Sequence, residues 1–221
     1  FDDLLDWHNW FLQNRILQPA GLVALGSYFQ QYEEGTDSAI DGLAISLGET
    51  RNTMQAARFE SGLDNSPMYD GNMFDNQTTH LMQLYDVGMS SLYVQEAYAL
   101  AQLADILGRD RGVSTMLRSR GDAMRDKISQ HLWDPSQQIF VNRYPNGTFA
   151  GAHVSPTSFY PMMTGGASEE QVNVMVQSWL FNASRFCISP DGNFTGNNPS
   201  VCYWGLPSIS ADDPAYLQGQ W

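Results

Sequence analysis

The fold of this chain is decided by residues 93–132, which read YVQEAYALAQLADILGRDRGVSTMLRSRGDAMRDKISQHL. Apolar side chains in the first half recur at steps of four, three, four and three residues, the spacing that gathers them on one face of an α-helix: Tyr93, Ala97, Leu100, Ala104 and Leu107. Gly108 stands where a C-terminal helix cap is expected. The second half repeats the pattern after a very short connection, at Val113, Leu117, Met124, Ile128 and Leu132, before Pro135. Two helices joined so closely are predicted to pack antiparallel.

Shorter elements are predicted on both sides of this pair. The spacing of apolar side chains predicts an amphipathic helix over residues 2–17, ended by Pro19 and Gly21. Residues 138–144 alternate enough for a short strand, and the Asn-Gly pair at 146–147 supplies a turn. One short β-hairpin is therefore expected.

A third strong helix is predicted to begin after Ser168. A serine caps the free amides of a first helical turn, and Glu169 and Glu170 suit the positive end of the helix dipole. Its apolar face comprises Val172, Met175, Val176, Trp179 and Leu180. Helix pairs joined by long loops predict an all-α chain, part of an α/α toroid or solenoid.

Composition excludes several functional classes. The chain has 221 residues, 43% of them hydrophobic and 12% aromatic, so it can bury a substantial core. Its 24 acidic residues against 11 basic ones give a formal net charge of −13, and Lys127 is the only lysine. Such a surface repels phosphate backbones, so nucleic acid is not expected as a partner. No run approaches the roughly 20 apolar residues of a membrane span.

Two cysteines and four glycosylation sequons bear on the compartment. Cys187 and Cys202 flank a loop rich in Gly, Asn and Pro; they would be separate thiols in a reducing compartment and would pair in an oxidising one. Four asparagines fit the N-glycosylation acceptor pattern: Asn76, Asn146, Asn182 and Asn193. The two features together favour an oxidising, secretory origin.

The densest polar cluster lies at residues 58–70, RFESGLDNSPMYD. It offers the carboxylates of Glu60, Asp64 and Asp70, the amide of Asn65 and nearby aromatic rings. Sugar sites use that mixture, because rings stack on the sugar face while amides and carboxylates bind hydroxyls and an acid protonates the leaving oxygen. The same residues also fit a plain turn followed by a helix that has proline at its first position. Composition alone leaves both interpretations open.

The motif ESGLDNSP at residues 60–67 resembles the signature of glycoside hydrolase family 63 and its bacterial and plant relatives. These include mannosylglycerate and glucosylglycerate hydrolases and, more distantly, the processing α-glucosidase of the endoplasmic reticulum. The likeness continues in the family's order at further segments: YDVG at 85–88, FVNR at 140–143, SPTSFYP at 155–161, GLPSIS at 205–210 and DDPA at 212–215. These motifs cover most of residues 55–221.

The resemblance implies an (α/α)6 toroid that hydrolyses α-linked glucosides or mannosides with inversion. It assigns Asp64 as the general acid. Such an acid must keep its proton near neutral pH, which burial or a neighbouring carboxylate can arrange, and Glu60, four residues earlier, is a candidate for that neighbour. In the family the catalytic base is a glutamate much nearer the C-terminus, and no glutamate follows Glu170 here. The base is therefore expected outside this chain.

Motif positions also imply a set of sugar contacts: Phe59, Glu60, Asn65, Tyr85, Asp86 and Trp221. Phe59 replaces the tryptophan usual in relatives with sugar–glycerate substrates; it can stack but cannot donate a hydrogen bond, so glucose versus mannose stays open. No histidine or acidic cluster has metal-ligand spacing, and no metal or cofactor is expected. His8 and His131 lie near helical apolar faces and are expected to be core or interface residues.

Two functional interpretations follow. In the first, residues 1–221 are a partial (α/α)6 catalytic domain that lacks flanking sequence at both ends, is inactive alone, and is completed by the rest of its domain or by another polypeptide. In the second, the chain is a non-catalytic secreted glycoprotein module that keeps the toroid for structure or carbohydrate binding.

Overall fold

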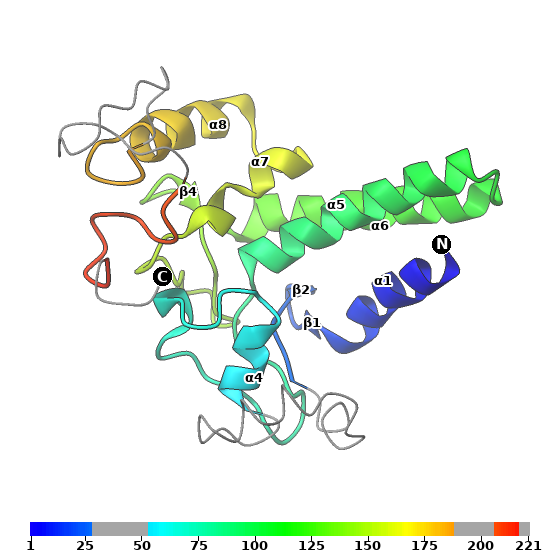
Figure 1. Cartoon of the computed structure of the whole chain (residues 1–221), viewed down its shortest axis with the longest axis horizontal. Helices are drawn as coiled ribbons and strands as arrows, with labels where there is room; N and C mark the ends of the chain where they lie inside the picture. The colour runs from blue at the N-terminus through cyan, green and yellow to red at the C-terminus, as the bar shows by residue number, and fades with distance from the viewer. Residues whose placement is uncertain (28–52, 188–205, 217–221) are drawn as a thin grey trace.

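The computed structural model describes residues 1–27, 53–187 and 206–216. Over these ranges the chain is mostly helical, as predicted, and its named strands form two short antiparallel hairpins (Figure 1). Among the helices of the described ranges, none has the combination of length and apolar character that would let it cross a bilayer. The predictions that concern Asn193, Cys202 and Trp221 lie outside the described residues.

The two predicted long helices are confirmed as α5 (Val87–Ile106) and α6 (Arg111–His131). Gly108 has a φ of 64°, a left-handed conformation that ends α5 at little steric cost, and the Asp110 carboxylate caps α6 by accepting the Gly112 amide at 2.7 Å. The helices run side by side and antiparallel (Figure 1). Their apolar stripes face the core, where Val94, Ala97 and Ile128 have no exposed surface.

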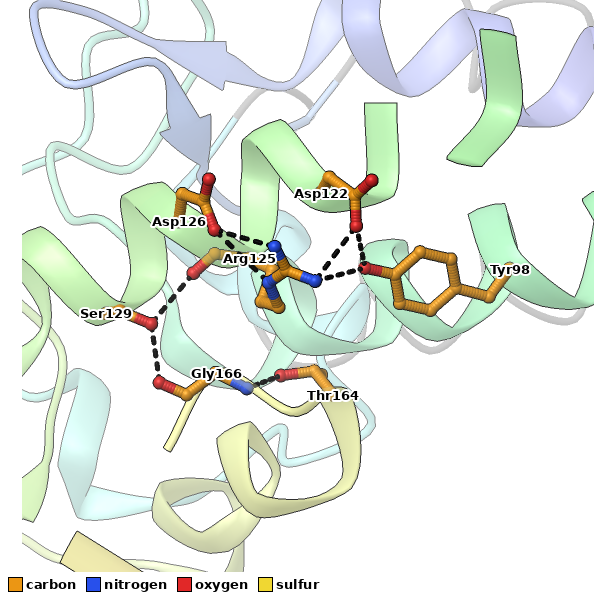
Figure 2. A network of polar contacts seen from close by, with 7 residues as sticks. All are labelled: Tyr98, Asp122, Arg125, Asp126, Ser129, Thr164 and Gly166. Carbon is orange, nitrogen blue, oxygen red and sulfur yellow. Dashed lines mark hydrogen bonds and ion pairs between the residues drawn. The ribbon is translucent and has the colours of Figure 1, made fainter. Parts of the chain in front are cut away.

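Polar contacts tie the exposed flank of this helix pair to the short helix α7 (Pro161–Thr164). Arg125 of α6 donates to the Tyr98 hydroxyl of α5 at 3.2 Å and to the Asp122 carboxylate at 2.9 Å, while its other nitrogens bind Asp126 (Figure 2). The Ser129 hydroxyl lies between the carbonyl oxygens of Arg125 and Gly166, which follows α7 (Figure 2). The Ser129–Gly166 contact fixes the end of α7 against the C-terminal part of α6.

The N-terminal helix is shorter than predicted. Helix α1 spans Asp2–Asn14, and the next residues turn into a hairpin of β1 (Ile16–Leu17) and β2 (Leu22–Val23). The prediction of a helix to residue 17 was wrong because strand pairing buries Leu17, Leu22 and Val23 in the main core, which a continued helix would not do. Gly21, with a φ of 69°, lies in the hairpin turn, not at a helix end.

The second hairpin forms on the other side of the predicted strand: the strand is predicted to pair across the turn at 146–147, but it pairs with the residues before it. Strand β4 (Ile139–Phe140) pairs with β3 (Trp133–Asp134), which precedes it. The Asp134 carboxylate accepts the Ser136 amide at 2.8 Å and stabilises the turn between the two strands. The expected turn at 146–147 is present, since the Tyr144 amide donates to the Thr148 carbonyl at 2.9 Å. The residues on its two sides form an isolated β-bridge, between Arg143 and Phe149, and no named strand pair.

Ser168 caps the third predicted helix as expected. Helix α8 spans Glu169–Met175, and the Ser168 hydroxyl and the Gln171 side chain form a reciprocal capping box. A π-helical turn, Val176–Leu180, continues it and buries Trp179. The largest core cluster takes residues from α5, α6, α8, this turn and both hairpins.

The remaining elements are short and lie around residues 53–69 and 156–159. They are α4 (Met54–Phe59) and the 3-10 helices Pro67–Tyr69 and Pro156–Phe159. A second core cluster, which includes Ala57, Tyr69 and Leu84, packs beneath α4.

A buried ion pair joins the α1–β1 junction to the end of α4. The fully buried Arg15 side chain donates from Nε to both oxygens of Glu60, at 3.0 and 2.8 Å, and from Nη2 to Oε1. The Gly26 amide donates to Glu60 Oε2 at 2.8 Å, and a Cβ at position 26 would lie 2.9 Å from Arg15 Cζ. Trp10 covers the guanidinium, whose Cζ lies 4.4 Å from the ring centroid. These contacts leave no room for a side chain at Gly26.

Replacement of Arg15 by Met should lower the free energy of unfolding by about 3 kcal/mol, because the Glu60 carboxylate would lose its counter-charge. We expect a much smaller loss for Arg118→Met, which breaks the exposed pair with Asp105. Urea titrations of both variants measure the difference. Equal losses would show that the Arg15 pair contributes no more than a surface pair.

Gly121→Val should cost about 1–3 kcal/mol, because a Cβ there would lie 2.7 Å from the Tyr98 ring that α5 packs against α6. Ala123→Val, at an exposed position of the same helix, should cost well under about 1 kcal/mol. Thermal unfolding checks both, and the Gly121→Val loss should shrink in a Tyr98→Ala background. A loss that is independent of Tyr98 would contradict this account.

Candidate functional site

The polar cluster at residues 58–70 folds into consecutive tight turns after α4. The Ser61 hydroxyl donates to the Arg58 carbonyl at 2.6 Å and accepts the Leu63 amide at 2.9 Å. Gly62 has a φ of 67°, which lets the chain reverse at little steric cost. Ser66 then caps the 3-10 helix that begins with Pro67, so the turn-and-helix interpretation of this stretch is confirmed locally.

Two cavities adjoin at this turn. The larger, which we call the α1–α5 cavity, has a volume of about 880 Å³ and lies between α1, α4 and α5. The smaller, the motif cavity, measures about 230 Å³ and lies over the N-terminal end of α5. Both are lined by Ser61, Gly62, Met89 and Leu92, so the residues after Glu60 form part of the wall of each.

The α1–α5 cavity combines aromatic rings with carboxylates. Trp7, Phe11, Phe59 and Tyr93 supply the rings, and Glu60 and Glu96 supply the carboxylates. Trp7 is 52% exposed, so part of its ring is available to a ligand. Rings beside carboxylates are the chemistry that binds sugars, because C–H groups stack on rings while hydroxyls donate to carboxylates.

The three carboxylates of the polar cluster have different partners. Arg15 binds Glu60, and Arg58 donates to Asp70 at 2.8 Å. Within the described ranges, no hydrogen bond or ion pair reaches the half-buried carboxylate of Asp64, whose neighbour Leu63 lines the motif cavity. Because Arg15 neutralises Glu60, the geometry does not support Glu60 as the charge that keeps Asp64 protonated.

Asp86 lies at the floor of the motif cavity and caps α5. Its Oδ1 accepts the Met89 amide at 2.7 Å, and its Oδ2 accepts the Tyr69 hydroxyl at 3.0 Å and the Asn142 amide at 3.4 Å. Burial raises the pKa of the Asp86 carboxyl above its ordinary value, although these hydrogen bonds act in the opposite direction. The pKa of Tyr69 is also raised, chiefly by its own burial and then by the charge of Asp86. Asp86 therefore joins three segments at the cavity floor.

The other predicted sugar contacts are placed differently. Phe59 lines the α1–α5 cavity, and Asn65 is exposed beside Asp64. Tyr85 is 3% exposed, accepts the Ala20 amide at 3.2 Å and lines neither cavity of the pair. The structure thus brings Phe59, Glu60 and Asp86 to the two adjoining cavities, whereas Asp64, Asn65 and Tyr85 are not among the residues that line either.

Sequence reasoning did not connect His8 with Tyr93 and Glu96. His8 is fully buried, as expected of a core histidine; its Nδ1 donates to Glu96 Oε2 at 3.0 Å, and its ring stacks on Tyr93 with centroids 4.2 Å apart. The spacing of Tyr93 and Glu96 places them near each other on α5, but only the packing of α1 against α5 brings His8 to both. Within the described ranges, no group of His, Cys, Asp and Glu has the arrangement of a metal site.

Comparison with solved structures shows the fold. A sialidase has a TM-score of 0.61 at 14% identity, over 98% of this chain and 15% of that chain. Neutral trehalase Nth1 from Saccharomyces cerevisiae has a TM-score of 0.56 at 16% identity, over 90% and 38%. A family 63 mannosylglycerate hydrolase from Thermus thermophilus, in complex with glucose, has a TM-score of 0.53 at 17% identity, over 80% and 43%. The all-α, toroid-like fold expected from the sequence is confirmed by these neighbours.

Sequence comparisons give the family. An uncharacterised protein of Borreliella burgdorferi is 23% identical over 134 residues, which are 61% of this chain and 25% of that protein, so the chain spans much less than the length of this relative. The family model described as a mannosylglycerate hydrolase MGH1-like glycoside hydrolase domain matches residues 1–221. The chain therefore belongs to the MGH1-like glycoside hydrolase family.

Proposed function

We propose that the protein hydrolyses an α-linked glucoside or mannoside with inversion and that Asp64 is the general acid. The observation that carries this assignment is the set of partners in the polar cluster: Arg15 binds Glu60 and Arg58 binds Asp70, whereas no described group holds the Asp64 carboxylate. A general acid has to exchange a proton with the leaving oxygen, and a carboxyl without a fixed cation can do so.

Inversion requires a second carboxylate that activates water on the opposite face of the sugar, about 6.5–9.5 Å from the acid. Our proposal places that base, a glutamate, outside residues 1–221. The two glutamates that line the α1–α5 cavity are engaged in other contacts, Glu60 with Arg15 and Glu96 with His8. Their engagement supports a base from elsewhere.

The sugar class rests on the rings and on the names of the structural neighbours. Trp7 and Phe59 line one cavity and can stack against a sugar, and Asn65 is exposed beside Asp64. Among the neighbours are a trehalase and a mannosylglycerate hydrolase with bound glucose. An α-linked glucoside or mannoside is the substrate class that agrees with both.

We further propose a secretory origin for the protein. Asn76 and Asn146 are exposed, and Asn182 is half-buried, so two of the sequons within the described ranges are open to glycosylation. Asn146 lies in a turn in which its side-chain oxygen accepts the Thr148 amide at 2.9 Å. Cys187 is 6% exposed and is expected to pair with Cys202.

Asp64→Asn in the full-length protein should abolish hydrolysis of natural disaccharides, because an amide has the shape of the acid but cannot deliver its proton. Activity should fall by at least about 100-fold with a poor leaving group and much less with an activated aryl glycoside. Asp70→Asn, which alters the exposed partner of Arg58, is the matched control and should retain activity.

Near-normal turnover by Asp64→Asn would remove the residue from this role. If the unaltered full-length protein binds α-glycosides but does not hydrolyse any, the alternative of a non-catalytic carbohydrate-binding module replaces the enzymatic proposal.

In protein purified from its natural source, Cys187 and Cys202 should resist alkylation until a reductant is added. Closure of the loop between them should contribute roughly 3 kcal/mol to stability. Intact mass before and after enzymatic deglycosylation should also reveal glycans on at least two of the four sequons. Freely alkylated thiols together with an unchanged mass would argue against a secretory origin.

A further inference from the structure

A third cavity, which we call the Lys127 cavity, has a volume of about 420 Å³ and lies at the C-terminal end of α6. The β1–β2 turn forms one wall, and residues 143–147 form another. Among the described residues that line it, the charged and titratable nitrogen groups are those of Lys127, His131 and Arg143, and none of these lining residues carries a carboxylate. The described lining of this cavity is therefore basic, although the chain as a whole has a net charge of −13.

The two permanent cations are held in place without being neutralised. Lys127 Nζ donates to the Gly21 carbonyl at 3.0 Å. Arg143 donates from Nε to the Gly147 carbonyl at 2.8 Å and from Nη1 to the His131 carbonyl at 3.0 Å. Carbonyl oxygens orient these groups but carry no net charge, so the cavity remains positive.

Most other basic side chains within the described ranges lie in a different environment. Six arginines within the described ranges form ion pairs with carboxylates: Arg15, Arg58, Arg109, Arg118, Arg125 and Arg185. Four arginine or lysine residues of these ranges form none with a described carboxylate. Arg111 is exposed, and the half-buried Arg120 donates to Asn9 Oδ1 at 2.7 Å. Lys127 and Arg143 are both half-buried and line the same cavity. Partly buried charges are screened less by salt than exposed ones, so their attraction for an anion is stronger.

The protonation of His131 is affected by these two cations. Burial lowers the pKa of His131, and the charges of Arg143 and Lys127 lower it further. An anion in the cavity would offset both charges and stabilise the protonated ring. The phenols of Tyr85 and Tyr144 also line the cavity, while Pro19 and Ala20 of the hairpin turn carry no titratable group.

We propose that the Lys127 cavity binds a small molecule through a phosphate or carboxylate group held by Lys127 and Arg143. The volume falls within the roughly 300–1,000 Å³ of small-molecule sites. The cavity shares no lining residue with the α1–α5 cavity or the motif cavity, so this site is separate from the proposed glycosidase site. The net negative charge of the whole chain opposes anions at long range, so the local cations must supply the affinity.

Protonation and binding are linked in this site. Because a bound anion favours the protonated imidazole, the anion should raise the pKa of His131, and affinity should increase as the pH falls through that pKa. An anion that binds elsewhere on the surface would not shift His131 selectively among the four histidines of the chain.

The test is a proton NMR titration of the histidine ring signals of the full-length protein in inorganic phosphate, in acetate and in chloride at one ionic strength. The Thr148→Ala variant removes the Asn146 sequon from the rim without altering Asn146, and His131→Gln assigns the His131 signal. We expect the pKa of His131 to rise in phosphate relative to chloride. A rise in acetate as well would extend the site to carboxylates, whereas a rise in phosphate alone would restrict it to phosphate.

Matched variants then assign the contact. Lys127→Gln should weaken phosphate binding about tenfold, since a charge-assisted hydrogen bond is lost, and Lys127→Arg should restore much of the affinity. Arg118→Gln removes the same charge from an exposed position of α6 and should change the affinity less than about twofold. Circular dichroism checks that each variant is folded. An unchanged pKa of His131 in both anions, or equal losses in Lys127→Gln and Arg118→Gln, would overturn the proposal.

Discussion

The buried guanidinium of Arg15 is the constraint from which the arrangement around the polar cluster follows. A fully buried cation requires a carboxylate and a close hydrogen-bonding shell, and Glu60 with Gly26 and Trp10 provides them. This pairing fixes the end of α4 against the junction of α1 and β1. Ser61 and Gly62 are consequently held between two cavities, and Arg15 neutralises Glu60. The Arg15–Glu60 ion pair therefore makes Glu60 differ from Asp64, whose carboxylate has no described partner.

Helix α5 connects the core to the cavities. One stripe of the helix, with Val94 and Ala97, faces α6 and the core, whereas Met89, Leu92 and Glu96 face the cavities. Its N-terminal cap, Asp86, also binds Tyr69 and Asn142, which come from the polar cluster and from the segment after β4. A substitution at this cap would alter helix stability and cavity shape together. The packing of the helix pair and the geometry of the site are therefore not independent.

Basic residues of the protein differ in whether they bind a carboxylate or a backbone carbonyl. Most arginines serve the fold by pairing with the abundant carboxylates, as Arg118 does with Asp105 along the helix pair. Lys127 and Arg143 instead donate to backbone carbonyls and keep their charge. We propose that Lys127 and Arg143, which line one cavity together, bind an anion there, apart from the two cavities of the proposed sugar site.

The sequence by itself determined the regular helices and the family. The spacing of apolar residues gave α5 and α6, Gly108 and Ser168 marked helix ends, and the ESGLDNSP motif identified a glycoside hydrolase, because these signals depend on residues near one another in the chain. The end of α1 was misjudged because Ile16 and Leu17 have the spacing of a helix, and only their pairing with β2 and burial in the core favour a strand. Only the tertiary structure decided which carboxylate is paired, where Tyr85 lies and that His8 reaches Glu96. These contacts join residues separated by 45 to 88 positions, and local sequence patterns carry no information about such distant packing.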